Sequence, residues 1–383
     1  MAGYLMNLDN LESLRLYMRA GVYGTVLSQP NRQWLKHHEA TFADYVTMKA
    51  GDNIYFFIDR KIYGIGQLVN LGGDCKFLNF KDACTPQAFT YDAVKAELLW
   101  DEGILSANQR WICAFRPSPH FFRRGLDMDD MLASNPSAFR TLRAFWKVSF
   151  IKLDDNENQA FKDALLKLNQ DALLAPDADH VFGTEWQSQH AALHARVQSS
   201  DYRLKVAPML AACADGDRLR HEMAVEAGLL YQLAYSDPPT EGLFGSWGFL
   251  HHQVVASPFK PIDYMDRMDL FGYAFIPAFE PTKSRFLVGE IKKDAGTTAD
   301  LEQLLKYVDW VKDEYAFGDY GMIKAYLIAH DFEGSVIEGR KEIATRRYIV
   351  GRRPAKSCEW SDLSLVKYAY DPEQQRLAFT IAE

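Results

Sequence analysis

One octet constrains the fold more than any other segment: Phe286-Leu287-Val288-Gly289-Glu290-Ile291-Lys292-Lys293. Its apolar run predicts a buried β-strand, and side chains alternate between the two faces of a strand with a period of two. Glu290 and Lys292 are therefore expected on the same face, at the end of the apolar run. A carboxylate and an ammonium in this position predict either a salt bridge at the strand end or a shared chemical function.

A second carboxylate upstream favours a shared function. Asp269 lies near the start of the β-type run Met268–Phe275, and the intervening chain is long enough for the two strands to meet. Two converging carboxylates repel each other unless a cation separates them. Mg²⁺ prefers oxygen ligands, commonly one or two carboxylates completed by water and substrate phosphate. Asp269 and Glu290 are thus predicted to bind Mg²⁺, with Mn²⁺ as a substitute, and the backbone carbonyl of Ile291 is a further candidate ligand.

A helix is predicted over Ala299–Tyr315, directly after this strand. Its core stripe consists of Leu301, Leu304, Leu305 and Val308. Gln303 and Tyr307 are four residues apart and share one flank of that stripe. We expect this flank to face the metal site.

The order of these residues resembles the PD-(D/E)xK nuclease superfamily. Asp269, then Glu290-x-Lys292, then Gln303-x-x-x-Tyr307 is similar to the branch with a QxxxY helix, which includes RecB-type nucleases and archaeal mismatch endonucleases. The resemblance covers roughly residues 217–335. Met268 stands where the family has a proline before the aspartate, which is a departure from the pattern.

The resemblance also implies an acidic residue on the preceding helix, predicted over Arg218–Leu233. Glu222 and Glu226 are both candidates on one face of that helix, and Glu226 is preferred. A solvated helix face is the alternative for either residue. Asp263 and Asp266 are possible substitutes for Asp269, but they lie in a Pro-bounded loop and rank lower.

The resemblance implies hydrolysis without a covalent intermediate. Asp269 and Glu290 hold one or two Mg²⁺ ions that polarise the scissile phosphate and activate water. Lys292 orients or deprotonates that water and offsets charge on the phosphoryl oxygens. Gln303 positions the nucleophile or a phosphate. The pair His251-His252 has no motif around it and is interpreted as a strand or loop feature.

The N-terminal half carries a second resemblance. Runs at Ile54–Ile58 and Ile62–Val69, separated by a polar turn, predict a β-hairpin. The stretch Tyr45–Phe57, with Ile62-Tyr63-Gly64-Ile65-Gly66 after it, resembles PUA-like barrels of the EVE type over about residues 20–150. That resemblance implies a reader of modified bases, which holds a flipped base between aromatic side chains.

Several side chains are candidates for nucleic-acid contact in this scheme. Trp34, Tyr45 and Trp111 are the candidate base-binding aromatics, with packing in the core as the alternative for each. Basic residues could meet phosphates, or could be ordinary surface positions: Arg32, Lys36, Arg110, Arg116, Arg123, Arg124 and the pairs Arg346-Arg347 and Arg352-Arg353.

Length and pattern together predict an α+β protein. A chain of 383 residues suggests two domains with a helical connector. We expect a PUA-like β-barrel over 1–155, helices over 156–205, and a restriction-endonuclease-like α/β domain with a mixed sheet over 206–383. The middle segment is either a connector or an integral helical subdomain.

Composition limits the remaining possibilities. A net charge of −8 counts mildly against a nucleic-acid binder, although acids at a metal site contribute to that total. Five scattered cysteines without a CxxC pair support neither a zinc ribbon nor a disulfide framework. A signal-peptide core and a run of about 20 apolar residues are both missing. The expectation is a cytoplasmic protein without a membrane partner.

These observations predict a Mg²⁺-dependent DNA endonuclease. A base-reading domain joined to a nuclease suggests a restriction or antiphage defence enzyme that acts on DNA, including modified DNA. A homodimer is expected, because one site per chain cuts one strand. The alternatives are a catalytically inactive nucleic-acid-binding scaffold and a nuclease that cleaves RNA.

Overall fold

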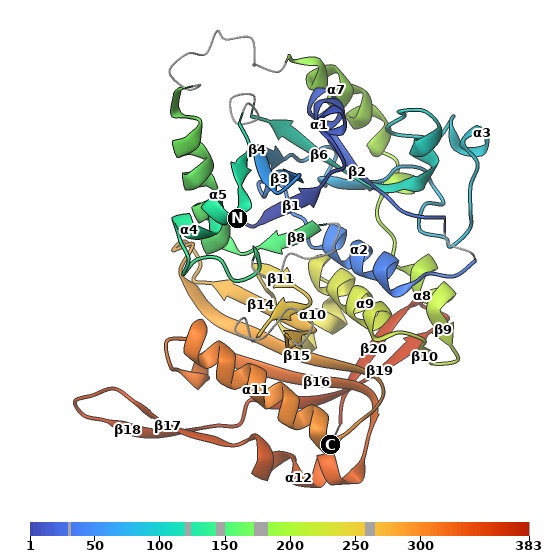
Figure 1. The fold of residues 1–383 in the computed structure, drawn as a ribbon. Helices are drawn as coiled ribbons and strands as arrows, with labels where there is room; N and C mark the ends of the chain where they lie inside the picture. The colour runs from blue at the N-terminus through green and yellow to red at the C-terminus, as the bar shows by residue number, and fades with distance from the viewer. Residues whose placement is uncertain (30–31, 119–123, 143–149, 172–182, 257–264, 383) are drawn as a thin grey trace. The chain divides into compact units, whose positions relative to one another are not determined.

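The computed structural model describes residues 1–29, 32–118, 124–142, 150–171, 183–256 and 265–382, and the chain is a mixed α/β protein. It divides into two compact units (Figure 1). Unit 1 comprises Met1–Gln33 and Met48–Lys205, and unit 2 comprises Trp34–Thr47 and Val206–Glu383. A short N-terminal segment is therefore part of the C-terminal unit.

Unit 1 is built on a sheet with the strand order β2-β6-β4-β3-β1-β8, in which β5 also pairs with β6 and β7 with β4. The predicted hairpin is confirmed as β3 and β4, which pair antiparallel. Asp59 and Arg60 form its turn with φ of 47° and 66°, the left-handed values that a tight hairpin turn requires. The strands are β1 (Gly3–Asn7), β2 (Val22–Val26), β3 (Asn53–Ile58), β4 (Lys61–Leu68), β5 (Lys76–Leu78), β6 (Gln109–Pro117), β7 (Leu126–Asp127) and β8 (Phe150–Leu153).

The helices predicted as a connector are part of unit 1. Phe161 and Leu165 of α5 are buried in the same core cluster as Tyr55 of β3. The rings of Tyr55 and Phe161 lie 5.0 Å apart, and the Tyr55 hydroxyl donates to Asn158 Oδ1 at 2.6 Å. The apolar face of α5 thus completes a core instead of bridging two domains. The helices of unit 1 are α1 (Leu11–Ala20), α3 (Tyr91–Val94), η1 (Ile104–Asn108), α4 (Met128–Ser134), α5 (Asp155–Leu168), α7 (Glu185–Val197) and η4 (Ser200–Tyr202).

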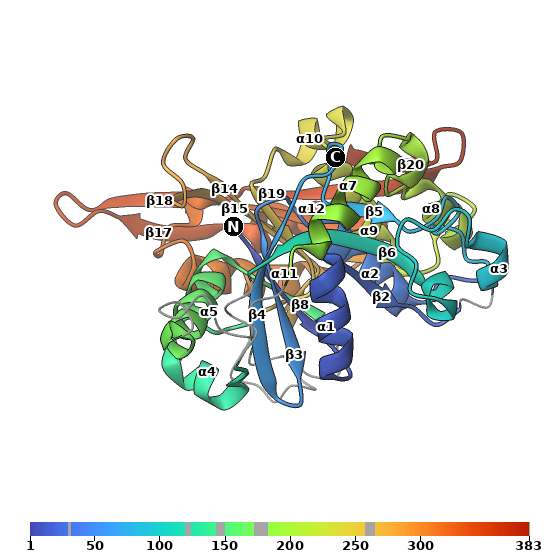
Figure 2. The ribbon, with the colours of Figure 1, turned by 90° about the horizontal axis from the view of Figure 1, so that it is seen from above.

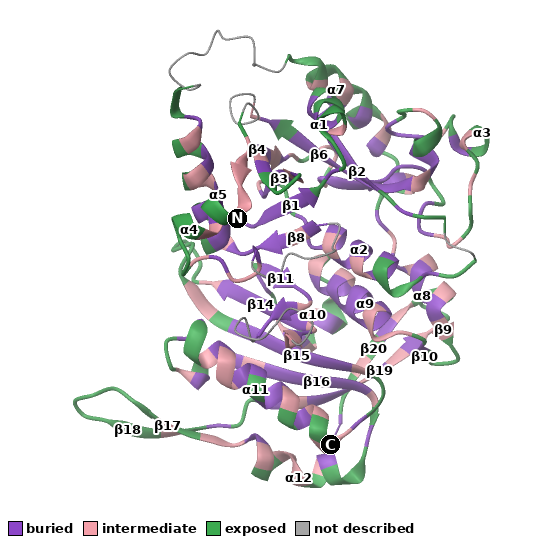
Figure 3. Ribbon diagram, in the orientation of Figure 1, coloured by how far each residue is buried: buried purple, intermediate pink, exposed green. Residues whose placement is uncertain are grey.

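Unit 2 contains a mixed sheet, as the sequence predicted, with the order β11-β14-β15-β16-β19-β20. The central pairs β15–β16 and β16–β19 are parallel, whereas β11–β14, β14–β15 and β19–β20 are antiparallel. In β15 the middle of the strand, Phe286–Ile291, is buried, whereas the residues on either side of it are more exposed (Figure 3). The strands of this sheet are β11 (Phe249–His251), β14 (Leu270–Phe275), β15 (Lys283–Gly296), β16 (Ile323–Phe332), β19 (Leu363–Asp371) and β20 (Arg376–Ile381).

Helices α9 and α11 both pack against β15. The predicted stripe of α11 is buried, and Thr297 begins this helix in a capping box with Asp300. Helix α9 begins later than predicted, because Arg218–Leu219 pairs as β10 with β9 (Ala214–Asp215). The helices of unit 2 are α2 (Lys36–Val46), α8 (Ala207–Cys213), α9 (Glu222–Ala234), α10 (Pro238–Phe244), α11 (Thr298–Glu314), η6 (Tyr320–Met322) and α12 (Gly334–Ala344).

Two small hairpins complete unit 2. Strands β12 (Val254–Val255) and β13 (Arg267–Met268) pair just before β14. Strands β17 (Arg346–Val350) and β18 (Lys356–Trp360) form a hairpin that extends away from the sheet of this unit (Figure 1 and Figure 2). Over the described residues, each helix is too short or too polar to cross a lipid bilayer.

Candidate functional site

Neighbouring strands bring Asp269 and Glu290 together. Strands β14 and β15 pair antiparallel with Leu270 opposite Gly289, so the next step of the same register sets Asp269 opposite Glu290. The backbone amide of Ile291 donates a hydrogen bond to Asp269 Oδ2 at 2.9 Å. The two acids that the sequence singled out therefore lie at one end of this strand pair.

Lys292 lies on the same face of β15 as Glu290. Its Nζ is 2.5 Å from Glu290 Oε1 and 3.7 Å from Asp300 Oδ1, at the first turn of α11. The Glu290 side chain is 2% exposed and that of Lys292 is 22% exposed. Lys293 follows the alternation of the strand, and its side chain is 45% exposed. The strand thus presents one lysine to the acids and the next to solvent.

Glu226 joins the site from α9. It is buried, and Gln253 Nε2 donates both to Glu226 Oε1 at 3.1 Å and to Asp269 Oδ1 at 2.9 Å. One amide group therefore links the two carboxylates. Glu222, one turn earlier on α9, is half-buried and acts on Lys292 through its charge. Of the two helix candidates, Glu226 is the one connected to Asp269.

A buried histidine adjoins Glu226, and sequence reasoning missed it. His252 Nδ1 lies 3.3 Å from Glu226 Oε2, and its Nε2 lies 3.1 Å from Asp44 Oδ1. Burial lowers the pKa of His252, but Asp44 and Glu226 outweigh this effect and raise the pKa to about 10. The ring is therefore an imidazolium held between two carboxylates at neutral pH. Asp44 lies on α2, far upstream in the chain, so no spacing rule could have paired it with His252.

Burial and repulsion from neighbouring carboxylates disfavour the charged forms of Asp269 and Glu290. Burial, then the charges of Glu226 and Glu290, raise the pKa of Asp269 well above its ordinary value. Burial raises the pKa of Glu290 to about 7 even though Lys292 opposes that shift. Glu290 Oε2 is buried and has no hydrogen-bond partner. Buried polar atoms are normally partnered, so the donor set of this site suits a cation.

These shifts predict that the metal-free protein becomes less stable as the pH rises. Glu290 has a pKa of about 7 in the folded protein, above its ordinary value in an unfolded chain. A group of this kind stabilises the fold below its unfolded pKa, and that contribution is lost as the pH rises through its folded pKa. We expect the melting temperature in EDTA to fall between about pH 5 and about pH 8, and Mg²⁺ to raise it more at the higher pH. A melting temperature that is equal across this range, with and without Mg²⁺, would contradict the electrostatic description.

Gln303 and Tyr307 lie on α11 beside this site. Gln303 Nε2 donates to the Tyr307 hydroxyl at 2.7 Å. Burial raises the pKa of Tyr307, and the charges of Glu290 and Asp269 add to that rise. The flank of α11 that carries Gln303 and Tyr307, predicted from helical spacing, is thus close enough to the two acids for their charges to act on Tyr307.

The candidate base-binding aromatics are buried and divided between the units. Trp34 is 1% exposed, while Tyr45 and Trp111 are 0% exposed. Trp34 and Tyr45 belong to unit 2, whereas Trp111 lies on β6 of unit 1. No single compact unit contains all three rings, and each has the burial of a core residue.

Other sequence candidates have varied positions. Arg110 is buried and donates to the carbonyl oxygens of Ala83 and Thr85, so it is a structural residue and not a surface contact for phosphate. Arg116 donates to Gln67 Oε1 at 3.0 Å. Asp266 is half-buried near β13. Asp263 and Arg123, which were also candidates, lie outside the described residues.

Comparison with known proteins identifies no family. No family model matches this chain. No curated protein matches it either. Among solved structures, the crystal structure of protein Atu2648 from Agrobacterium tumefaciens is similar to part of the chain, with 12% sequence identity and a TM-score of 0.25. The similarity covers 44% of this chain and 93% of that one.

Proposed function

We propose that unit 2 is a metal-dependent nuclease that hydrolyses phosphodiester bonds in DNA. The observation that carries the proposal is the pair of half-buried Asp269 and buried Glu290, with Lys292 bonded to Glu290 on the same strand face. Glu226 extends this group through its shared amide donor, Gln253. A strand-end salt bridge alone would need only one of these acids.

The residues fit a hard divalent cation. The candidate ligands Asp269 and Glu290 offer only oxygen atoms, which Mg²⁺ and Mn²⁺ prefer. Carboxylates at the site outnumber its cationic groups, and one buried oxygen of Glu290 lacks a partner. The backbone carbonyl of Ile291 is a further candidate ligand. When bound, the cation would polarise a phosphoryl oxygen and lower the pKa of a coordinated water.

The protein's own groups have distinct roles in this proposal. Burial lowers the pKa of Lys292, but Glu290 and other acids raise it above its ordinary value, so its Nζ remains protonated. A protonated lysine orients water and offsets charge on the phosphoryl oxygens, but it does not remove a proton. His252 keeps a positive charge beside Glu226 and so offsets part of the negative charge that the acids bring to the site. Gln303, beside Tyr307, would position the nucleophile or a phosphate.

The DNA substrate and the role of unit 1 are further parts of the proposal. The β17–β18 hairpin carries Arg347, whose side chain is 81% exposed, with exposed Arg352 and Arg353 at its tip. Guanidinium groups on an extended hairpin can contact the phosphate backbone. Arg346 differs, because its Nε is 3.1 Å from Asp309 Oδ1. In this scheme unit 1 would be the PUA-like reader of a restriction or defence enzyme that acts as a homodimer.

The test is a nuclease assay on the full chain with a matched pair of lysine variants. We expect wild type to cleave DNA with Mg²⁺ or Mn²⁺ and to lose activity in EDTA. Lys292→Met should reduce cleavage at least about a hundredfold, because it removes a charge that acts on the transition state. Lys293→Met changes the neighbouring, more exposed lysine and should retain activity.

The same assay separates the alternative functions. Parallel reactions with single-stranded RNA, double-stranded DNA and single-stranded DNA identify the substrate. Cleavage of RNA alone would replace DNA with RNA in the proposal. If wild type cleaves none of these with either metal but binds DNA, the inactive scaffold is the correct description. Equal activity of both lysine variants would remove Lys292 from the site.

A further inference from the structure

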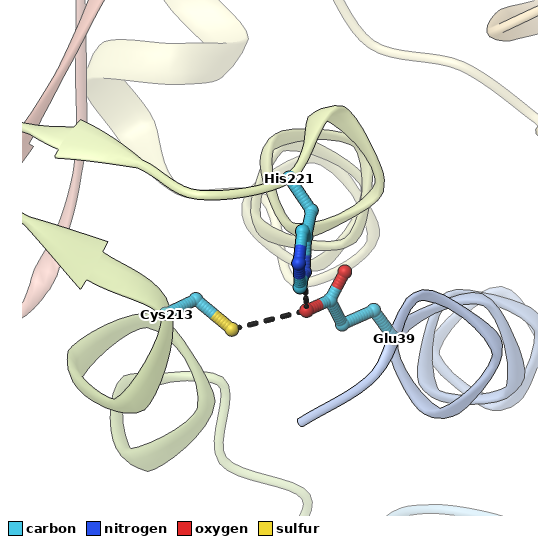
Figure 4. Close-up of side chains that lie close together, drawn as sticks. All are labelled: Glu39, Cys213 and His221. Carbon is cyan, nitrogen blue, oxygen red and sulfur yellow. Dashed lines mark hydrogen bonds and ion pairs between the residues drawn. The ribbon is translucent and has the colours of Figure 1, made fainter. Parts of the chain in front are cut away.

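A second cluster of metal-ligating side chains lies in unit 2, away from the acids on β14 and β15. Glu39 of α2, Cys213 at the end of α8 and His221 just before α9 each offer one ligand atom, and these atoms lie within 4.8 Å of one another (Figure 4). Within the ranges described above, this is the one group of three such side chains with that spacing. In the nuclease site, by contrast, the amide of Gln253 stands between Glu226 and Asp269.

The hydrogen bonds of this cluster leave one buried atom unused. Cys213 Sγ donates to Glu39 Oε1 at 3.1 Å, and His221 Nδ1 lies 2.7 Å from the same oxygen. Glu39 is 0% exposed, and its other carboxylate oxygen, Oε2, is buried without a partner. The adjacent Arg220 directs its guanidinium to the backbone carbonyls of Ala212 and Cys213. A buried oxygen without a partner, beside a thiol and an imidazole, is the independent sign of an absent ligand.

We propose that Glu39, Cys213 and His221 bind a Zn²⁺ ion. Sulfur, imidazole nitrogen and carboxylate oxygen are the three ligand types that zinc uses in proteins. The mixed donor set favours zinc over Mg²⁺, which prefers oxygen alone. Binding would convert the Cys213 thiol to a thiolate and release its proton to solvent. The His221 side chain is 27% exposed, so the cluster has a route to solvent on that side.

The proposed ion would join segments that are far apart in the chain. Glu39 is separated from Cys213 by 174 positions and from His221 by 182. Helix α2 already packs on α9, where the rings of Phe42 and Tyr231 stack at 6.4 Å. A zinc ion at Glu39 would fix this helix to the rest of unit 2. The proposed ion has three protein ligands, which leaves the fourth position of a tetrahedral zinc for water. This proposal does not depend on the nuclease proposal.

Co²⁺ titration of the full chain tests the proposal, because a cobalt–thiolate bond gives a charge-transfer band in the near ultraviolet. We expect wild type to bind one equivalent with this band, and Zn²⁺ to displace it. Cys213→Ser keeps a donor for Glu39 but removes the thiolate, so the band should disappear and Zn²⁺ affinity should fall at least about a hundredfold. Cys358→Ser changes a half-exposed cysteine on β18 and should leave the band intact.

Two further variants make each result decisive. Asp269→Asn alters the all-oxygen site and should keep the cobalt–thiolate band, which separates this proposal from the nuclease proposal. His221→Asn changes the most exposed ligand and should weaken Zn²⁺ binding. It provides the test if Cys213→Ser does not fold. If wild type shows no cobalt–thiolate band, or if the band persists in Cys213→Ser, the zinc proposal is wrong. The three side chains would then form only a hydrogen-bonded cluster.

Discussion

Asp269→Asn is expected to stabilise the metal-free protein at about pH 8 and, at the same time, to reduce Mg²⁺-dependent cleavage at least about a hundredfold. The two effects have one cause. Asp269 is half-buried beside Glu226 and Glu290, and desolvation together with these two charges raises its pKa well above the ordinary value. The ionised Asp269 carboxylate therefore destabilises the metal-free fold. The same carboxylate is one of the proposed metal ligands.

The stability gain follows from linkage between protonation and folding. An aspartate with a raised pKa stabilises the fold while protonated and loses that contribution as the pH rises. Asparagine stays neutral, and its carbonyl oxygen can still accept from the Ile291 amide. The free energy of unfolding of Asp269→Asn should therefore exceed that of wild type at alkaline pH. The gain should shrink towards acidic pH.

The loss of activity follows from the cation. A bound metal contributes several kcal/mol to stabilisation of a phosphoryl transition state, and about 1.4 kcal/mol changes a rate tenfold. Urea denaturation in EDTA and cleavage rates in Mg²⁺ measure the two effects on the same preparations. Asp294→Asn is the matched control, because this β15 aspartate is 61% exposed and pairs with Lys293 and Arg218. A destabilised Asp269→Asn protein that cleaves normally would favour a purely structural role.

The sequence predicted those parts of the site that depend on local periodicity. Alternation along β15 was enough to set Glu290 and Lys292 on one face, and the apolar stripe of α11 predicted the flank that carries Gln303. Each prediction needed only the geometry of a single element. The pairing of Asp269 with Glu290 required one further assumption, that two neighbouring apolar runs form adjacent strands.

The remainder of the site depends on contacts that no local pattern encodes. Gln253 follows a short strand, yet its amide links Glu226 to Asp269. Helix α2 belongs to unit 2 although most of its neighbours in the sequence belong to unit 1. Asp44 lies on α2, and tertiary packing brings it to His252 although the two are 208 positions apart in the chain. The same limit explains Arg110, which is basic by type and buried among backbone carbonyls.

His252→Asn is expected to destabilise the protein by about 3–5 kcal/mol near neutral pH, the usual cost of removing one partner from a buried ion pair. The His252 side chain is 4% exposed, and its ring bridges Asp44 and Glu226. Asparagine cannot carry the positive charge, so both carboxylates would be left in a buried site without their cation. Cleavage should also fall, because the proposed site would lose the positive charge beside Glu226.

The pH dependence separates the charge of His252 from its packing. The neighbouring acids raise the pKa of His252 to about 10, above the ordinary value in an unfolded chain. The stabilisation is therefore complete below about pH 6.5 and is lost as the pH rises through about 10. The destabilisation caused by His252→Asn should be largest near pH 6 and much smaller near pH 10, as urea denaturation at both values will measure.

Two comparisons complete this experiment. His251→Asn changes the neighbouring buried histidine at the end of β11 and is the control for the loss of a buried imidazole ring. The double variant Asp44→Asn/His252→Asn should lose less stability than the sum of the two single variants. Each single change leaves a buried charge without its partner, and the second change removes that charge. The loss of stability in His252→Asn could instead be the same at both pH values and additive with that of Asp44→Asn. In that case the ring contributes through packing alone, and the contacts from Asp44 through His252 to Glu226 transmit no charge effect to the candidate site.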